Sequence, residues 1–149
     1  MEVPGMLFGR KQRSISRLLV VEDEPLIAFD TERMLREHGY QVIATVDRVA
    51  DAQRAIAGAT EKVDLILADV RLADGSGVDV ARAASERSIP VMFVTSSCPP
   101  EARALAVGFL AKPFVERDLL GAIDAVDAAM AGRATKRLPL GFELFVTAA

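Results

Sequence analysis

Short groups of carboxylates, hydroxyls and one amine each follow an apolar run in this 149-residue chain. If the runs are parallel strands, their carboxyl ends meet at one edge of a sheet, where doubly wound α/β folds hold their ligands. Carboxylates gathered there repel one another unless a cation lies between them, and their hard oxygen atoms suit Mg²⁺. Together with a lysine and a hydroxyl donor, that ion could neutralise a phosphoryl group during its transfer. The groups are Glu22-Asp23-Glu24 after Leu18–Val21, Asp69 at the end of Val63–Asp69, Thr95-Ser96 at the end of Pro90–Thr95, and Lys112-Pro113 after Gly108–Ala111.

Each of these residues, taken alone, has a simpler structural explanation. Glu22 and Asp23 could stabilise the N-terminus of the helix that follows them, which favours negative charge. Asp69 could begin a turn, Thr95 could be an ordinary strand residue, and Lys112 could be a solvated loop lysine. These explanations are nearly independent of one another, whereas a shared site accounts for all of the residues at once. We therefore favour the shared site.

The elements that would position these residues alternate between strand and helix. Short apolar runs bounded by acids, glycine or proline are typical of strands buried on both faces, and proline and glycine mark several helix ends. The alternation predicts a doubly wound, flavodoxin-like α/β fold with a five-stranded parallel sheet and right-handed crossovers. We expect strands at 18–21, 40–46, 63–69, 90–95 and 108–111, and helices at 25–38, 49–57, 78–87 and 116–130, with at most a short helix after Pro99-Pro100.

The composition argues against several other classes of protein. A single cysteine, Cys98, excludes an internal disulfide and a cysteine-based zinc site. A single histidine, His38, leaves no histidine pair for a metal and argues against a Ser-His-Asp triad. A formal net charge of -3 disfavours nucleic-acid binding through bulk charge, and no apolar run approaches the ~18 residues of a membrane span. We expect a cytoplasmic domain that neither binds nucleic acid directly nor inserts into a membrane.

The chain divides into one domain and two extensions. We expect residues 1–16 to form a basic, flexible N-terminal extension, residues 17–131 to form the domain, and residues 132–149 to form a C-terminal tail. The tail is too short for an effector domain, and its apolar residues alternate with others. It could pair as an edge strand or dock on a partner, although packing on the domain's own surface is the simpler interpretation. The apolar residues are Leu138, Leu140, Phe142, Leu144 and Phe145.

Several motifs, in order, resemble the receiver domain of bacterial response regulators, which act in two-component signalling. They are V-V-E-D at 20–23, L-A-D-V-R-L-A-D-G-S-G at 67–77, V-T-S at 94–96 and K-P-F at 112–114. The resemblance covers residues 17 to 131 and implies the family's (βα)5 fold. The second motif and the short segment before Gly108 are similar to those of stand-alone receivers from alphaproteobacteria.

The resemblance also implies a chemistry. Asp69 would be the phosphoacceptor, taking a phosphoryl group from a phosphohistidine of a sensor kinase or a histidine phosphotransfer protein. Glu22, Asp23, Asp69 and the backbone carbonyl of Arg71 would hold Mg²⁺. No dedicated enzymatic activity is expected beyond self-phosphorylation from a phosphodonor and autodephosphorylation.

Further implied roles concern the response to the phosphoryl group. Thr95 and Lys112 would contact its oxygen atoms, and Thr95 would be drawn toward it. Phe109 occupies the aromatic switch position and could rotate into the space that Thr95 leaves, although an ordinary core role explains it equally well. The family usually has a cis bond before the residue that corresponds to Pro113.

One region departs from the family pattern. The segment from Thr95 to Phe109 is shorter than we expect for the family, and Pro99 and Pro100 occupy part of it. Because proline is tolerated only in the first turn of a helix, we expect the fourth helix to be short or irregular. A short fourth helix would affect the face through which the family usually signals, and the sequence leaves open whether that face is retained.

The sequence therefore predicts a single-domain response regulator that acts through protein contacts or as a phosphorelay intermediate or sink. Its partners would be the phosphodonor and a downstream protein, and a homodimer is one option. The alternative is a degenerate receiver that docks without phosphorylation. An aspartate-nucleophile phosphohydrolase would need a D-x-D motif where this chain has Glu22-Asp23-Glu24. A flavin carrier would need a phosphate-cradling loop there, and these acids would repel the phosphate.

Overall fold

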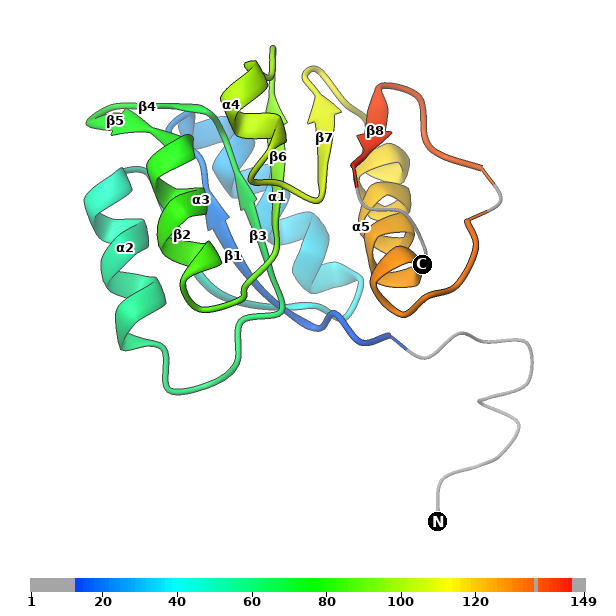
Figure 1. The fold of residues 1–149 in the computed structure, drawn as a ribbon, viewed down its shortest axis with the longest axis horizontal. Helices are drawn as coiled ribbons and strands as arrows, with labels where there is room; N and C mark the ends of the chain where they lie inside the picture. Colours follow the sequence, from blue (N-terminus) through cyan, green and yellow to red (C-terminus); the bar gives the residue numbers. More distant parts are fainter. Residues whose placement is uncertain (1–12, 136, 146–149) are drawn as a thin grey trace.

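The computed structural model describes residues 13–135 and 137–145, in which five parallel strands alternate with five helices (Figure 1). The parallel strands lie in the order β2-β1-β3-β6-β7, so the order reverses beside β1 and opens a ligand-binding crevice there. This confirms the predicted fold class. The strands are β1 (Arg17–Val21), β2 (Gln41–Val46), β3 (Leu65–Ala68), β6 (Val91–Thr95) and β7 (Gly108–Ala111). The helices are α1 (Pro25–Glu37), α2 (Val49–Gly58), α3 (Gly77–Ser85), α4 (Pro100–Arg103) and α5 (Glu116–Met130).

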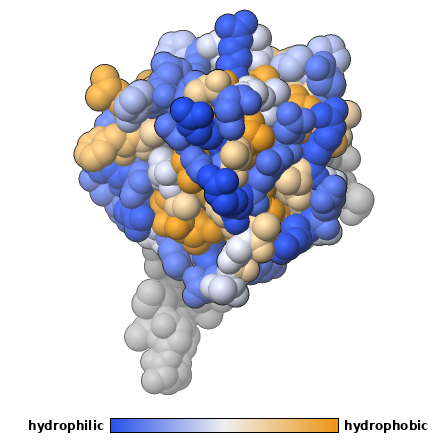
Figure 2. Space-filling model, turned by 90° about the vertical axis from the view of Figure 1, so that its left-hand side faces the viewer, coloured by the Kyte–Doolittle hydropathy of each residue, from blue (hydrophilic) through white to orange (hydrophobic). Residues whose placement is uncertain are grey.

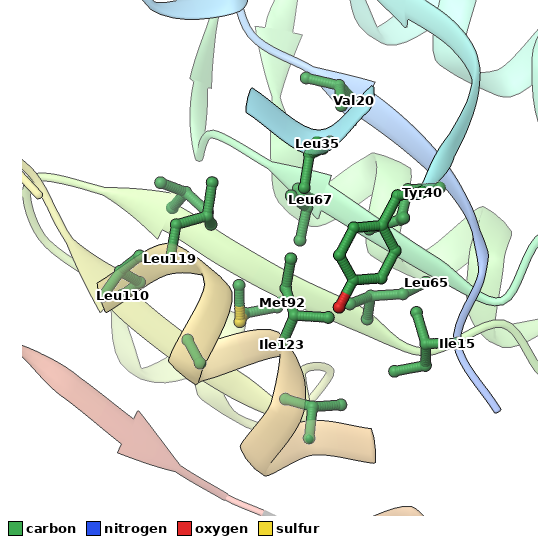
Figure 3. Close-up of a cluster of buried hydrophobic side chains, with 14 of the residues drawn as sticks. Ile15, Val20, Leu35, Tyr40, Leu65, Leu67, Met92, Leu110, Leu119 and Ile123 are labelled. Carbon is green, nitrogen blue, oxygen red and sulfur yellow. The ribbon is translucent and has the colours of Figure 1, made fainter. Parts of the chain in front are cut away.

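Both faces of the sheet are covered, because successive strand residues point to opposite sides. Leu18 and Val20 pack with α1 and α5, whereas Leu19 and Val21 pack with α2, α3 and α4. The first of these two cores is drawn in Figure 3, where Leu35 of α1 and Ile123 of α5 lie near the central strands. No helix in the described part of the chain is both long enough and apolar enough to cross a membrane.

The fourth helix is short, as predicted. It begins at Pro100 and ends at Arg103, after four residues. Its residue Ala102 is fully buried in the core of α2 and α3. The helix is therefore a single turn that fixes one apolar contact.

The C-terminal segment adds a sixth strand to the sheet, β8 (Phe142–Leu144), which pairs antiparallel with β7. Phe142 is also buried in the core with α1 and α5. Of the alternatives for this segment, the structure thus combines edge pairing with packing on the domain's own surface. Figure 1 shows β8 next to β7 and α5.

The expected N-terminal extension, residues 1–16, lies outside the described residues as far as residue 12. Residues 13–16 lie against the domain. The buried carboxylate of Asp127 in α5 accepts hydrogen bonds from the backbone N–H groups of Ser14 and Ile15, at 3.0 and 3.1 Å. The Ile15 side chain is itself buried.

The loop after β3 contains a small hairpin of β4 (Arg71–Leu72) and β5 (Gly75–Ser76), and it is fastened to α2. The carboxylate of Asp74 accepts hydrogen bonds from the backbone N–H groups of Val49 (2.6 Å) and Ala50 (3.1 Å). Asp74 thereby caps α2, whose own N-cap residue supplies no side-chain hydrogen bond. The hairpin and α2 lie on the side of the molecule shown in Figure 2, where hydrophobic patches are scattered over a mainly hydrophilic surface.

The same loop then turns tightly into α3. The Ser76 hydroxyl accepts a hydrogen bond from the Val78 N–H at 3.0 Å and caps α3. A Cβ atom at Gly77 would lie 2.0 Å from the backbone carbonyl oxygen of Asp69. Only glycine permits this approach, so the loop returns directly beneath Asp69 and holds its backbone in place.

We predict that Asp74→Ala lowers the thermal midpoint at neutral pH, because α2 loses its cap. The Val49 N–H, the largest influence, holds the pKa of Asp74 below its ordinary value. A lowered folded-state pKa gives stability that is complete above the unfolded-state pKa and is lost as pH falls through the folded-state pKa. Thermal denaturation of both proteins should therefore show a difference that is full above about pH 5 and shrinks toward about pH 2.

The control is Asp30→Ala, which removes an exposed acid from α1. Its midpoint should follow that of the wild type across the pH range. If the difference between D74A and wild type persists unchanged at low pH, the capping carboxylate is not its source.

Candidate functional site

The predicted residues meet at the carboxyl ends of the parallel strands. Glu22, Asp69 and Thr95 are buried there, with 5%, 6% and 4% of their surface exposed. Asp69 and Thr95 face an open cleft of about 710 Å³. It is lined by Asp23, Glu24, Asp69, Val70, Arg71, Thr95, Ser96, Ser97, Cys98 and Pro99.

Lys112 is the centre of the charge network. Its Nζ lies 2.7 Å from Asp69 Oδ2 and 2.8 Å from Glu22 Oε1, and its side chain is only 8% exposed. The same Nζ lies 3.0 Å from Oε2 of Glu24, which is more exposed. The peptide bond that follows Lys112 is cis, as the family resemblance implies. One ammonium group thus contacts carboxylates from two separate segments of the chain.

The electrostatics of the site reflect an excess of negative charge. Burial raises the pKa of Glu22, although hydrogen bonds from Lys112 and from the Glu24 N–H act in the opposite direction. Burial alone would lower the pKa of Lys112, but its hydrogen bonds to Asp69, Glu22 and Glu24 raise the pKa above the ordinary value. Lys112 is therefore a permanent cation, and further positive charge at the site would be stabilising.

Both oxygen atoms of the Asp69 carboxylate accept a hydrogen bond, which fixes the orientation of the group. Its Oδ1 accepts a hydrogen bond from the Arg71 N–H at 3.2 Å, and its Oδ2 accepts one from Lys112. Its backbone N–H donates to the carbonyl of Val21 at 2.9 Å, which joins β3 to β1. The residue thus lines the cleft with a fixed backbone and a fixed carboxylate plane.

The acids form a group with the chemistry of a divalent-cation site. Glu22, Asp23, Glu24 and Asp69 each offer a carboxylate oxygen, and these four atoms lie within 4.8 Å of one another. Hard oxygen donors at this spacing, with a single ammonium group among them, fit Mg²⁺. The predicted Mg²⁺ ligands are three of these acids, Glu22, Asp23 and Asp69, and the Arg71 carbonyl. This ligand set stays a prediction.

Glu24 is the residue that sequence reasoning left out of the ligand set. It is the N-cap residue of α1, and its N–H donates to Glu22 Oε2 at 3.1 Å. The sequence does contain a pattern that indicates its role, because three consecutive acids precede Pro25. What the linear pattern did not give was the turn that directs the Glu24 side chain back toward Lys112.

Thr95 and Phe109 lie on the same face of neighbouring strands. Thr95 is paired with Ala111 and Phe93 with Phe109, so Phe109 is diagonal to Thr95. Phe109 is half-buried against the core of α2, α3 and α4. The Thr95 carbonyl accepts a hydrogen bond from the Lys112 N–H at 2.9 Å. The switch role of Phe109 stays a prediction.

Comparison with known proteins agrees with this geometry. The model of the response regulator receiver domain matches residues 18–124. The transcriptional regulatory protein PdtaR of Mycobacterium tuberculosis is 37% identical over 115 residues, which are 72% of this chain and 55% of PdtaR. The phyllosphere-induced regulator PhyR of Methylorubrum extorquens is 39% identical over 83 residues, which are 54% of this chain and 31% of PhyR. The chain therefore spans about half the length of PdtaR and less of PhyR.

Solved structures show the same fold. The CheY-like receiver domain protein of Methanospirillum hungatei superposes with a TM-score of 0.66 at 27% identity, covering 76% of this chain and 95% of its own. The chemotaxis protein CheY4 of Vibrio cholerae gives 0.65 at 28% identity, covering 76% and 99%. The fold and the acid cluster define a receiver domain. The chain belongs to the response regulator receiver family of two-component signalling.

We predict that Lys112→Met lowers the free energy of unfolding at neutral pH by about 3 kcal/mol, because buried carboxylates lose the cation that neutralises them. Loss of the ammonium group also raises the pKa of Glu22 further. A raised folded-state pKa makes the folded protein retain a proton, so stability recovers as pH falls. Urea unfolding should show the largest loss near about pH 8 and a smaller one near about pH 5.

Lys62→Met is the matched control, because Lys62 is 81% exposed and lies 4.0 Å from Asp64. It should change the free energy of unfolding little at any pH. Equal losses in the two variants would contradict the central role of Lys112.

Proposed function

We propose that this receiver domain accepts a phosphoryl group on Asp69 from a phosphohistidine of a sensor kinase or histidine phosphotransfer protein in the cytoplasm. The observation that carries the proposal is the Asp69 carboxylate itself. It lines an open cleft, one of its oxygens lies 2.7 Å from Lys112, and the other accepts the Arg71 N–H. A carboxylate fixed in this way is oriented for attack on an incoming phosphorus atom.

The proposed transfer exchanges one bond to phosphorus for another. A carboxylate oxygen of Asp69 forms a bond to phosphorus, the bond between phosphorus and the histidine nitrogen breaks, and that nitrogen keeps the electron pair. The product is an acyl phosphate. Lys112 is within reach of the new phosphoryl oxygens, because it already contacts Asp69. Thr95, buried at the end of β6, lines the same cleft and could donate its hydroxyl hydrogen to another of these oxygens.

Glu22, Asp23 and Asp69 would hold Mg²⁺, with Glu24 close enough to join them. When bound, the ion supplies charge neutralisation for the transferring group. Glu22 and Asp69 lie deep in the site, whereas Glu24 is exposed at its rim. The output would be contact with a downstream protein, or onward transfer of the phosphoryl group in a relay.

The proposed function predicts that acetyl phosphate with Mg²⁺ adds one phosphoryl group to the wild type and none to Asp69→Asn. Intact mass spectrometry measures the gain directly. Removing divalent cations with a chelator should abolish it. Asp79→Asn, which alters an exposed acid of α3, is the matched control and should be phosphorylated normally.

Uptake by D69N at the wild-type level would place the phosphoryl group elsewhere. Failure of the wild type with acetyl phosphate and with a phosphorylated histidine phosphotransfer domain, in Mg²⁺ or Mn²⁺, would favour the phosphorylation-independent docking module.

The surface beside the cleft fits a phosphodonor protein. Leu26 and Phe29 project from α1 with 81% and 67% of their surface exposed. A second hollow of about 390 Å³ lies between α1 and the loop after β7, and it shares Glu24 and Ser96 with the phosphoacceptor cleft. An apolar patch next to a phosphoacceptor would let a donor protein dock while its histidine enters the cleft.

We therefore predict that Leu26→Ser with Phe29→Ser slows transfer from a phosphorylated histidine phosphotransfer domain by about tenfold or more. Uptake from acetyl phosphate, which needs no docking surface, should be unchanged. Met130→Ser is the control, because Met130 is comparably apolar and exposed but ends α5. Equal slowing with both donors would indicate damage to the site rather than loss of docking.

A further inference from the structure

The outer edge of β7 is covered by residues 137–145, which we call the strap. Its backbone is bonded to β7 at both ends: the Ala111 N–H donates to the Gly141 carbonyl, and the Phe145 N–H donates to the Val107 carbonyl, each at 2.9 Å. Between these bonds β8 pairs with β7 in antiparallel register. The strap therefore occupies an edge that the five parallel strands alone would leave open.

On one face, the strap packs at distances that glycine residues permit. A Cβ atom at Gly108 would lie 2.9 Å from the ring of Phe142, and one at Gly121 would lie 2.9 Å from Cγ of Pro139. Phe142 is the buried large side chain that the described part of the strap contributes, and Leu144 packs against the same core while partly exposed. The strap is thus well fitted, yet its apolar attachment rests mainly on two side chains, a contact small enough to open without unfolding the five parallel strands.

On the other face, the strap is joined to α4. Arg103 Nη2 lies 3.0 Å from Glu143 Oε1, and the guanidinium lies 4.5 Å from the centre of the Phe145 ring. Glu143 is directly opposite Phe109 in the register of β7 and β8. The strap therefore contacts both the short helix and the residue at the predicted switch position.

The strap is also one residue away from the phosphoacceptor site. The Ala111 N–H is bonded to the strap, and the next N–H, that of Lys112, is bonded to the Thr95 carbonyl. Any movement of Thr95 or Lys112 toward a new group on Asp69 would be transmitted to this stretch of β7. The strap and the site thus share one short stretch of backbone.

We propose that the strap is a displaceable strand, bound to β7 while Asp69 is unmodified and released when Asp69 carries a phosphoryl group. The proposal rests on the proposed function. Release would follow because Lys112 and Phe109 are next to the backbone bonds and side chains that hold the strap, and Thr95 is bonded to Lys112. By thermodynamic reciprocity, a bound strap must oppose the phosphorylated conformation to the same extent.

The test is amide hydrogen exchange of the full chain, with and without acetyl phosphate and Mg²⁺, with phosphoryl content measured by intact mass in the same sample. The Ala111 and Phe145 amides should exchange about tenfold or more faster in the phosphorylated protein. The Val107 amide bonds to Val91 of β6 instead and should keep its protection.

Two other outcomes would contradict different parts of the proposal. A stoichiometric gain of phosphate with unchanged exchange at Ala111 and Phe145 would make β8 a permanent sixth strand, and only the strap proposal would fail. No gain of phosphate under any condition would overturn the proposed function and the strap proposal with it.

Reciprocity supplies a second test at equilibrium. Arg103→Met removes the contacts to Glu143 and Phe145 from an exposed position, so the fold should persist. We expect it to bind beryllium trifluoride with Mg²⁺, a non-covalent phosphoryl analogue, about fivefold or more tightly than the wild type. Leu140→Ser, at a strap residue that is 88% exposed, is the control and should bind as the wild type does. Equal affinities for all three proteins would refute the coupling.

Discussion

The contact between the Lys112 ammonium group and carboxylates from two segments of the chain is the interaction on which the site depends. Parallel strands bring their carboxyl ends together, so Glu22 and Asp69 approach each other whatever their charges. Two unit charges about 4 Å apart interact by about 4 kcal/mol near a protein surface, which is comparable to the contribution of several hydrogen bonds. The Lys112 ammonium group offsets this repulsion between the two carboxylates. The site keeps a net negative charge, which favours a divalent cation. In the function proposed above, the carboxylate partners of the ammonium group would be exchanged for phosphoryl oxygens.

The scaffold holds this cluster through close backbone packing and through a side-chain cap. Gly77 allows the loop after β3 to pass directly beneath Asp69, and Asp74 fastens that loop to the start of α2. On the other side, Lys112 is attached to Thr95 by a backbone hydrogen bond. The Asp69 carboxylate is therefore held in one position, because the chain around it has few alternative conformations.

Much of the fold could be predicted, because buried parallel strands are continuous apolar runs and the helices between them have proline or glycine at their ends. The site could be predicted because strand ends converge in such a sheet. Other features depend on contacts between distant segments, which no local pattern encodes. Asp74 looks like a turn residue, yet it caps a helix that begins 25 residues earlier. Similarly, the alternation around Phe142 fits an edge strand, a docking segment or surface packing. The segment pairs with β7 because the outer edge of that strand would otherwise be open.

The short sixth strand has a consequence for how the protein behaves among its own copies. Unpaired edges of apolar strands are templates for uncontrolled association, and natural sheets protect them with short strands and charged residues. β7 reads Gly-Phe-Leu-Ala and carries no charge, whereas β8 is three residues long and has Glu143 at its centre. The strand that terminates the sheet is therefore better suited to face solvent than the strand it covers. The covered edge therefore favours solubility at high concentration, and a chain cut before residue 137 would lose this cover while its acid cluster remained whole.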